Sequence, residues 1–94
     1  MAEERIIKKR IITTKGNLIE VTAWKVPKSL SYPEGIKYSY NLISDGKRII
    51  AIDNYNNEGH HVHIFAKKIP YIFRSIERLD EDFFRLVDGF ENEG

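Results

Sequence analysis

Hydrophobic and polar positions alternate along the first half of the chain, which is typical of strands with one buried face. Residues 18–26 place Ile19, Val21 and Ala23 on one side and polar or aromatic residues on the other. Residues 5–14 are rich in β-branched side chains, and a Lys-Gly-Asn turn separates the two segments. This pattern predicts a hairpin. It is followed by a predicted loop at residues 27–35, which is rich in proline, glycine and serine.

A second hairpin is predicted for residues 36–53, with a turn at Ser-Asp-Gly 44–46. A two-residue loop would place Tyr40 opposite Ala51, whereas a three-residue loop places Tyr40 opposite Ile50 and Tyr38 opposite Ile52. The second register gathers the apolar side chains on one face, so it is the predicted one. The two strands of this hairpin are expected at residues 36–43 and 48–53.

The second half of the chain predicts one more strand and a helix. Residues 61–66 alternate as a strand, and Pro70 ends the ladder. Ser75 is a predicted N-cap, and apolar residues recur at helical spacing from Ile76 to Phe90. The predicted fold is α+β: a mainly antiparallel five-stranded sheet with one C-terminal amphipathic helix packed on it. With 94 residues, the chain is expected to form a single domain, 1–94.

Composition narrows the function classes. The net charge of +1 predicts no broad basic field, so any nucleic-acid binding needs a local patch. Cysteine is absent, which excludes disulfides and cysteine nucleophiles and favours the cytoplasm. We see no signal peptide or membrane span. Abundant isoleucine, lysine and glutamate without glutamine is typical of a protein from a thermophile. The exposed edges of a small sheet favour a homodimer.

Three histidines, His60, His61 and His63, fall within four residues and are the only ones in the chain. On a strand, His61 and His63 share a face at roughly 6–7 Å, while His60 points away. Two imidazoles can act as acid and base, which is what RNA cleavage through the 2′-hydroxyl requires. Asp53 is a candidate to orient an imidazole and Asn54 to bind substrate. Further candidates are Tyr71 as a hydrogen-bond donor, and Lys67, Lys68 and Arg74 as phosphate-binding cations.

Other interpretations of these residues are open. The histidines are equally well explained as polar surface, and Asp53 with Asn54 as an ordinary strand end. His61, His63 and Asp53 are also potential ligands for zinc, nickel or copper, which would make the protein a metal-binding phosphodiesterase. Their spacing fits no standard helical zinc motif, and we assign no metal or cofactor. The low net charge and Phe84, which falls off the apolar helix stripe, instead suggest a non-catalytic protein-interaction module.

Several short motifs follow one another in a fixed order from residue 36 onward. They are Tyr-x-Tyr, Asp-Gly, Asp53-Asn54, Gly59-His60-His61-Val62-His63, Ile69-Pro70-Tyr71-x-Phe73 and Ser75-Ile76-x-x-Leu79-x-x-Asp82-Phe83. This order resembles the TumE-like family of small toxins from toxin–antitoxin pairs, whose partners are typically helix-turn-helix antitoxins. By position, the resemblance implies a functional set of Asp53, Asn54, His61, His63 and Tyr71.

The resemblance is weaker directly after the histidines. Family members often carry a glycine-rich or acidic stretch there, whereas residues 64–68 of this chain are apolar and basic. The leading expectation is a toxin that acts as a metal-independent ribonuclease, with RNA and an antitoxin as partners.

Overall fold

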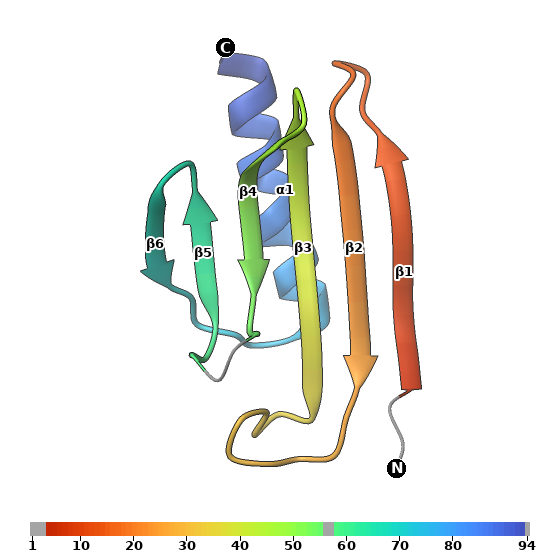
Figure 1. Ribbon diagram of the computed structural model, residues 1–94, viewed down its shortest axis with the longest axis vertical. Helices are drawn as coiled ribbons and strands as arrows, with labels where there is room; N and C mark the ends of the chain where they lie inside the picture. Colours follow the sequence, from red (N-terminus) through yellow and green to blue (C-terminus); the bar gives the residue numbers. More distant parts are fainter. Residues whose placement is uncertain (1–3, 56–57, 94) are drawn as a thin grey trace.

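A computed structural model describes residues 4–55 and 58–93 (Figure 1). Six strands form one antiparallel sheet in which every strand pairs with its neighbour in the sequence, and one helix lies against it. The α+β prediction is confirmed, but the sheet has six strands where five were predicted. The elements are β1 (Glu4–Ile12), β2 (Leu18–Lys25), β3 (Ile36–Ser44), β4 (Lys47–Asp53), β5 (His61–Ile64), β6 (Lys67–Pro70) and α1 (Ile76–Glu93).

The additional strand arises because β5 is shorter than predicted. The chain reverses after Ile64 through a turn at Phe65 and Ala66, and β6 runs back with Lys67 opposite Ile64. Phe65 takes a positive φ of 53°, a conformation that turns usually assign to Gly, Asn or Asp. The sequence therefore carries no signal for this turn. Pro70 is tolerated because β6 is an edge strand.

The register of the second hairpin also differs from the prediction. The turn is a two-residue one at Asp45 and Gly46, both at positive φ (52° and 76°), as a type I′ turn requires. A bulge beyond the turn then shifts the pairing by one residue, so that Tyr40 lies opposite Ile52 and not opposite Ile50. The shared apolar face was nevertheless predicted correctly. The bulge and the predicted longer loop shift the pairing by one residue in opposite directions, and either shift leaves the same side chains on the core side.

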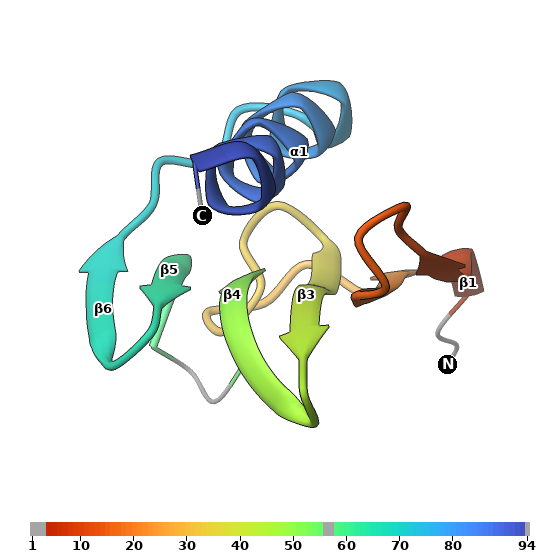
Figure 2. The same ribbon diagram turned by 90° about the horizontal axis from the view of Figure 1, so that it is seen from above.

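The core lies between the sheet and α1, which covers one face only (Figure 2). The ring of Phe83 meets that of Tyr40 edge-on at 5.4 Å between centroids, and the Tyr40 hydroxyl donates to Asp80 of the helix. The predicted cap is confirmed, since the backbone N–H of Arg78 donates to Ser75 Oγ at 3.1 Å. The buried core residues are Ile19, Val21, Ala23, Tyr38, Tyr40, Leu42, Ile50, Ile52, Val62, Leu79, Phe83 and Val87.

The sheet face opposite α1, here called the open face, is mostly polar, although Trp24, Ile43 and Ala51 also lie on it. Its residues alternate with the core positions; Thr22, Ser39 and Asn41 are examples. No other described element lies over this face (Figure 2). Within the described residues no helix is long and apolar enough to cross a membrane. The outer strands β1 and β6 leave two edges of the sheet unpaired in this single chain, and a homodimer stays a prediction.

Asn54, which follows β4, ties the end of that strand to the start of β3. Its side chain is 1% exposed. The amide Nδ2 donates to the carbonyl of Ile36 at 2.8 Å, and Oδ1 accepts the N–H of Tyr38 at 3.0 Å. Each bond satisfies a backbone group at the edge of the core, so Asn54 holds the two strands together where the loop over residues 27–35 enters the sheet.

Replacing this side chain tests its structural role. We expect Asn54→Ala to lower the free energy of unfolding by about 2–4 kcal/mol, because two backbone groups lose their partners in a buried site. Urea denaturation followed by circular dichroism measures the change. Asn41→Ala is the control and should cost less than about 1 kcal/mol, since its amide bonds only Ser39 on the half-exposed open face. Equal losses in the two variants would contradict this role.

Candidate functional site

The open face of β4 and β5 brings together three of the predicted catalytic residues. Asp53 lies opposite His61 in the ladder, and the His61 and His63 rings are 6.4 Å apart between centroids. Nε2 of His63 is 3.5 Å from Oδ2 of Asp53. The same carboxylate oxygen is 3.9 Å from the guanidinium of Arg48, a residue that we did not predict. Two imidazoles, a carboxylate and a cation thus share one partly exposed surface, here called the histidine surface.

The surroundings of His63 favour its neutral form. Burial lowers the pKa of His63 below its usual 6.5, and the Arg48 and Lys68 cations act in the same direction, against the opposing effect of Asp53. A neutral imidazole can accept a proton at pH 7. Because the unfolded chain then binds this proton more readily than the folded one, His63 makes the fold less stable as the pH falls through 6.5.

The three predicted cations lie in different places. Lys68 lies opposite His63 in the β5–β6 ladder, so it belongs to the histidine surface. Its ammonium forms an ion pair with Glu58. Lys67 alternates with Lys68 and therefore points to the helix side of the sheet. Arg74 lies between β6 and α1, where it is exposed. Of the three, only Lys68 is placed on the open face.

Tyr71 and Asn54 are not brought to the histidine pair. The Tyr71 hydroxyl donates to Oδ2 of Asp82 at 2.6 Å, which binds the chain after β6 to α1. Burial first, and then this carboxylate, raise the pKa of Tyr71 above its usual value. Tyr71 therefore lies on the helix side. Asn54 is next to Asp53 in sequence, but its amide is committed to the backbone bonds described above.

His60 points to the helix side, as the strand alternation predicted, and there it has structural contacts. Its ring stacks on Phe73 at 5.1 Å between centroids, nearly parallel at 9°. Nδ1 is 2.7 Å from the Tyr38 hydroxyl and Nε2 is 3.1 Å from Glu34, a residue of the loop after β2. Both ring nitrogens are therefore occupied, and His60 joins that loop to the core.

A shallow basic groove lies beside the histidine surface on the open face. It encloses about 220 Å³ between β1 and Tyr55, and its floor carries the polar side chains of β2 and β3. Tyr55 joins the two surfaces, because its backbone N–H donates to Oδ1 of Asp53 at 3.4 Å. Lys37 holds its ammonium 4.9 Å from the centre of the Tyr55 ring. The groove residues are Lys8, Lys9, Arg10, Glu20, Thr22, Ser39, Asn41 and Tyr55.

Sequence reasoning found the histidines and Asp53 but missed Arg48 and Tyr55. The only signal for Arg48 was a basic residue at the start of a strand that ends in Asp53. Tyr55 is followed by residues 56–57, which lie outside the described part of the chain, and no periodic pattern assigns it to a face. Among the described residues, no three His, Cys, Asp or Glu side chains are grouped so that they could hold a metal ion.

These observations define a small α+β protein with an imidazole pair, a carboxylate and a basic groove on the uncovered face of its sheet. Comparison with family models matches residues 2–91 to the family described as toxin TumE. Because the match covers nearly the whole chain, the chain belongs to the TumE toxin family, and this membership implies an antitoxin partner. The resemblance found in the motifs is confirmed and extends to the first two strands. No curated protein and no solved structure matches the chain.

The position of Asp53 beside His63 makes a prediction about titration. Asp53→Asn should lower the pKa of His63 further, because it removes the carboxylate that opposes the effect of burial, and Arg48→Met should raise it. NMR titration of the imidazole carbon-bound protons measures both shifts. His60, on the other side of the sheet, serves as the internal control. A His63 pKa that neither substitution moves would show that the two charges do not act on this ring.

Proposed function

We propose that this toxin cleaves RNA without a metal ion, using His63 as the base and His61 as the acid. The observation that carries the proposal is the 6.4 Å separation of two imidazoles on one surface, with a carboxylate beside one of them. Two groups at that separation can lie on opposite sides of a phosphodiester, one near the attacking oxygen and one near the leaving oxygen. Membership of the toxin family supports an activity directed against the cell. RNA is the substrate that fits an acid–base pair of imidazoles, because its 2′-hydroxyl can attack the neighbouring phosphate.

The assignment of roles follows from the surroundings of each ring. Asp53 next to Nε2 of His63 favours a proton on that nitrogen, which leaves Nδ1 free to accept the proton of a 2′-hydroxyl. The 2′-oxygen then attacks the phosphorus and forms a 2′,3′-cyclic phosphate. The bond to the 5′-oxygen breaks, and His61 in its protonated form donates the proton that this oxygen needs. Lys68 and Arg48 are the nearest cations to balance the charge that develops on the phosphate.

The distribution of charge supports a polyanionic substrate on the open face. Helix α1 carries seven acidic residues and two arginines, so the rest of the chain holds thirteen of the fifteen basic residues but only seven of the fourteen acidic ones. The strand registers place six basic residues on the open face. The small net charge therefore results from an acidic helix side and a basic sheet side. These six are Arg5, Lys8, Arg10, Lys37, Arg48 and Lys68.

The basic groove suits a single RNA strand better than a duplex. Lys8 can bind a phosphate, and Arg10, which pairs with Glu20 at 3.2 Å, neutralises the one carboxylate among the groove residues. The neutral side chains of the floor offer hydrogen bonds, and the Tyr55 ring can stack on an unpaired base. Bases inside a duplex are not available for such stacking. Since Tyr55 adjoins Asp53, a strand that lies in the groove reaches the histidine pair without leaving the open face. The partner that controls the toxin is, in this proposal, a helix-turn-helix antitoxin.

The first test removes both catalytic imidazoles. We expect His61→Ala/His63→Ala to lose at least about 100-fold in RNA cleavage, because the variant has neither acid nor base. Cleavage of a labelled RNA by purified protein in the presence of EDTA gives the rate, and the 2′,3′-cyclic phosphate is the expected product.

His60→Gln is the matched control, since it removes the third histidine from the opposite side of the sheet. It should keep the wild-type rate per folded molecule. Wild-type protein that cleaves no RNA, or cleaves only when a divalent metal is added, would disprove the metal-independent mechanism.

The second test separates binding from cleavage. Wild-type protein is mixed with a fluorescent RNA of about 12 nucleotides, a length within the range of single-strand-binding sites, whose 2′-hydroxyls are methylated so that it cannot be cleaved. Lys8→Glu should weaken binding about tenfold and reduce its salt dependence, because one phosphate contact is lost. Fluorescence anisotropy at several salt concentrations measures both.

Lys15→Glu is the control for charge, because it makes the same change in the β1–β2 turn, away from the groove. It should bind nearly as wild type does. Equal weakening by the two substitutions, or equal affinity for duplex RNA, would show that the groove does not hold a single strand.

A further inference from the structure

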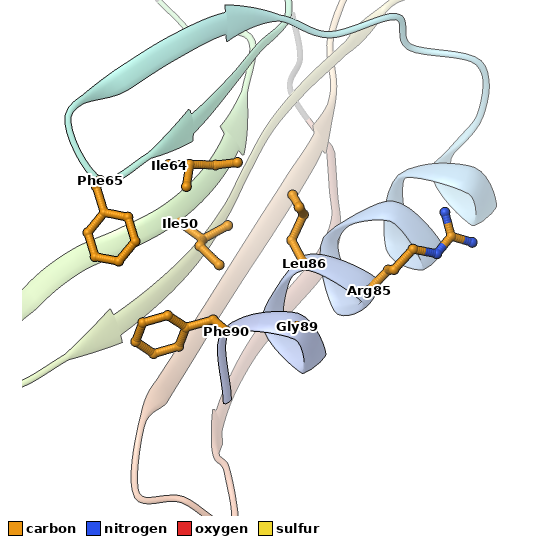
Figure 3. A pocket seen from close by; sticks show the side chains of 7 residues that line it. All are labelled: Ile50, Ile64, Phe65, Arg85, Leu86, Gly89 and Phe90. Atoms are coloured by element: carbon orange, nitrogen blue, oxygen red, sulfur yellow. The ribbon is translucent and has the colours of Figure 1, made fainter. Parts of the chain in front are cut away.

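An apolar groove lies on the helix side of the sheet, between α1 and the β5–β6 turn (Figure 3). Its volume is about 450 Å³. Arg85 lines it only with its stem, because the guanidinium points away from the two phenylalanine rings and pairs with Asp82 at 3.7 Å. The apolar lining residues are Ile50, Ile64, Phe65, Leu86 and Phe90.

A glycine inside the helix keeps this groove open. Gly89 lies within α1, which continues to Glu93, so it does not end the helix. A Cβ atom at this position would meet nothing within 4 Å, so packing within the chain does not require glycine here. Glycine is the least favourable residue after proline in a helix interior. The chain thus gives up helix stability at the one lining position where a side chain would fill the groove.

A second unfavourable feature lies on the other side of the same groove. Phe65 has a φ of 53°, which is strained for a residue with a large side chain, and its ring is 65% exposed. The backbone N–H of Phe65 donates to the carbonyl of Ile49 at 2.8 Å, which fixes the turn in this conformation. The ring is held 6.1 Å from that of Phe90, beside the groove and exposed to solvent. Neither feature benefits the isolated chain.

We propose that this groove receives an apolar side chain of the antitoxin. The proposal rests on the antitoxin pairing set out above, and it assigns that partner a place on the molecule. A missing side chain at Gly89 and a strained, exposed Phe65 are understandable if a partner covers both. Lys67 lies opposite Ile64 in the ladder and so adds a positive charge at the rim. The inserted segment is therefore expected to carry an acidic residue on its Lys67 side, and none toward α1, whose net charge is negative.

The location has a mechanistic consequence. The groove opens on the helix side, whereas the histidine pair and the basic groove lie on the open face. An antitoxin segment held here leaves the imidazoles themselves uncovered, so it anchors the partner while another part of the antitoxin blocks the open face.

The first experiment needs only the isolated toxin. Gly89→Ala should raise the melting temperature by roughly 4–8 °C, since alanine favours the helix and its methyl group meets no neighbour. Thermal unfolding followed by circular dichroism measures the shift. A lower melting temperature would show that the fold itself requires this glycine, and would overturn the inference.

The second experiment fills the groove. Gly89→Leu should weaken binding to the co-expressed and purified antitoxin at least tenfold in calorimetric titration. Asn92→Leu places the same side chain on the same helix outside the groove lining and should bind normally. Unchanged binding by Gly89→Leu would overturn the proposal. A change in the oligomeric state of Gly89→Leu in size-exclusion chromatography would also overturn it, because it would assign the groove to a second copy of the chain.

RNA cleavage by the same variants keeps the two proposals apart. Gly89→Leu should cleave at the wild-type rate, because the substitution lies on the other side of the sheet from the histidines. Loss of antitoxin binding without any cleavage by the wild type would disprove the ribonuclease and leave the docking site standing. Normal cleavage together with unchanged antitoxin binding by Gly89→Leu would disprove the docking site and leave the ribonuclease standing.

Discussion

One helix can shield only one face of a six-stranded sheet, and this constraint organises the whole molecule. The apolar side chains that the central strands direct toward α1 are buried there, around the contact between Tyr40 and Phe83. The other face must then be polar enough to meet water. The histidine pair and the basic residues lie on that face because the core leaves it free for them.

Two local features of β4 and its end keep the apolar side chains on the core side and the polar ones on the open face. The bulge in β4 returns Ile50 and Ile52 to the core side after a turn whose register would have sent them outward. Asn54 then closes the end of the same strand against β3, next to Asp53. The backbone of Asp53 is thus held by the contacts of its neighbour, and its carboxylate by Tyr55, His63 and Arg48, as a site that depends on geometry requires.

Much of the fold could be read from the sequence because alternation and helical spacing are strong signals. The strands up to Asp53, the helix and its cap at Ser75 followed from them. The turn at Phe65 did not, because its conformation is imposed by pairing on both sides and not by the residue itself. For the same reason β6 was missed. A compensating bulge leaves no trace in composition, so the register of the second hairpin was wrong although its faces were right.

The candidate site was predicted in part. Alternation alone placed His61 and His63 together and His60 apart. It could not show that Tyr71 would be drawn to Asp82 of α1, since that contact depends on how the helix returns across the sheet. Arg48 is near Asp53 only because the bulge sets both side chains on one face. Contacts within a strand are therefore predictable here, while those made by packing between elements are not.

The order of the strands has a consequence for how the protein reaches its native state. Every strand pairs with the one before it, so the sheet can assemble by successive zipping from any of its turns. Only short loops have to close during this process, which keeps its entropic barrier low. The contacts most distant in sequence, such as those of Glu91 with Thr13 and Asn17, join the end of the helix to the first hairpin. Docking of the helix is therefore expected to be the late, cooperative event that commits the chain to a single structure.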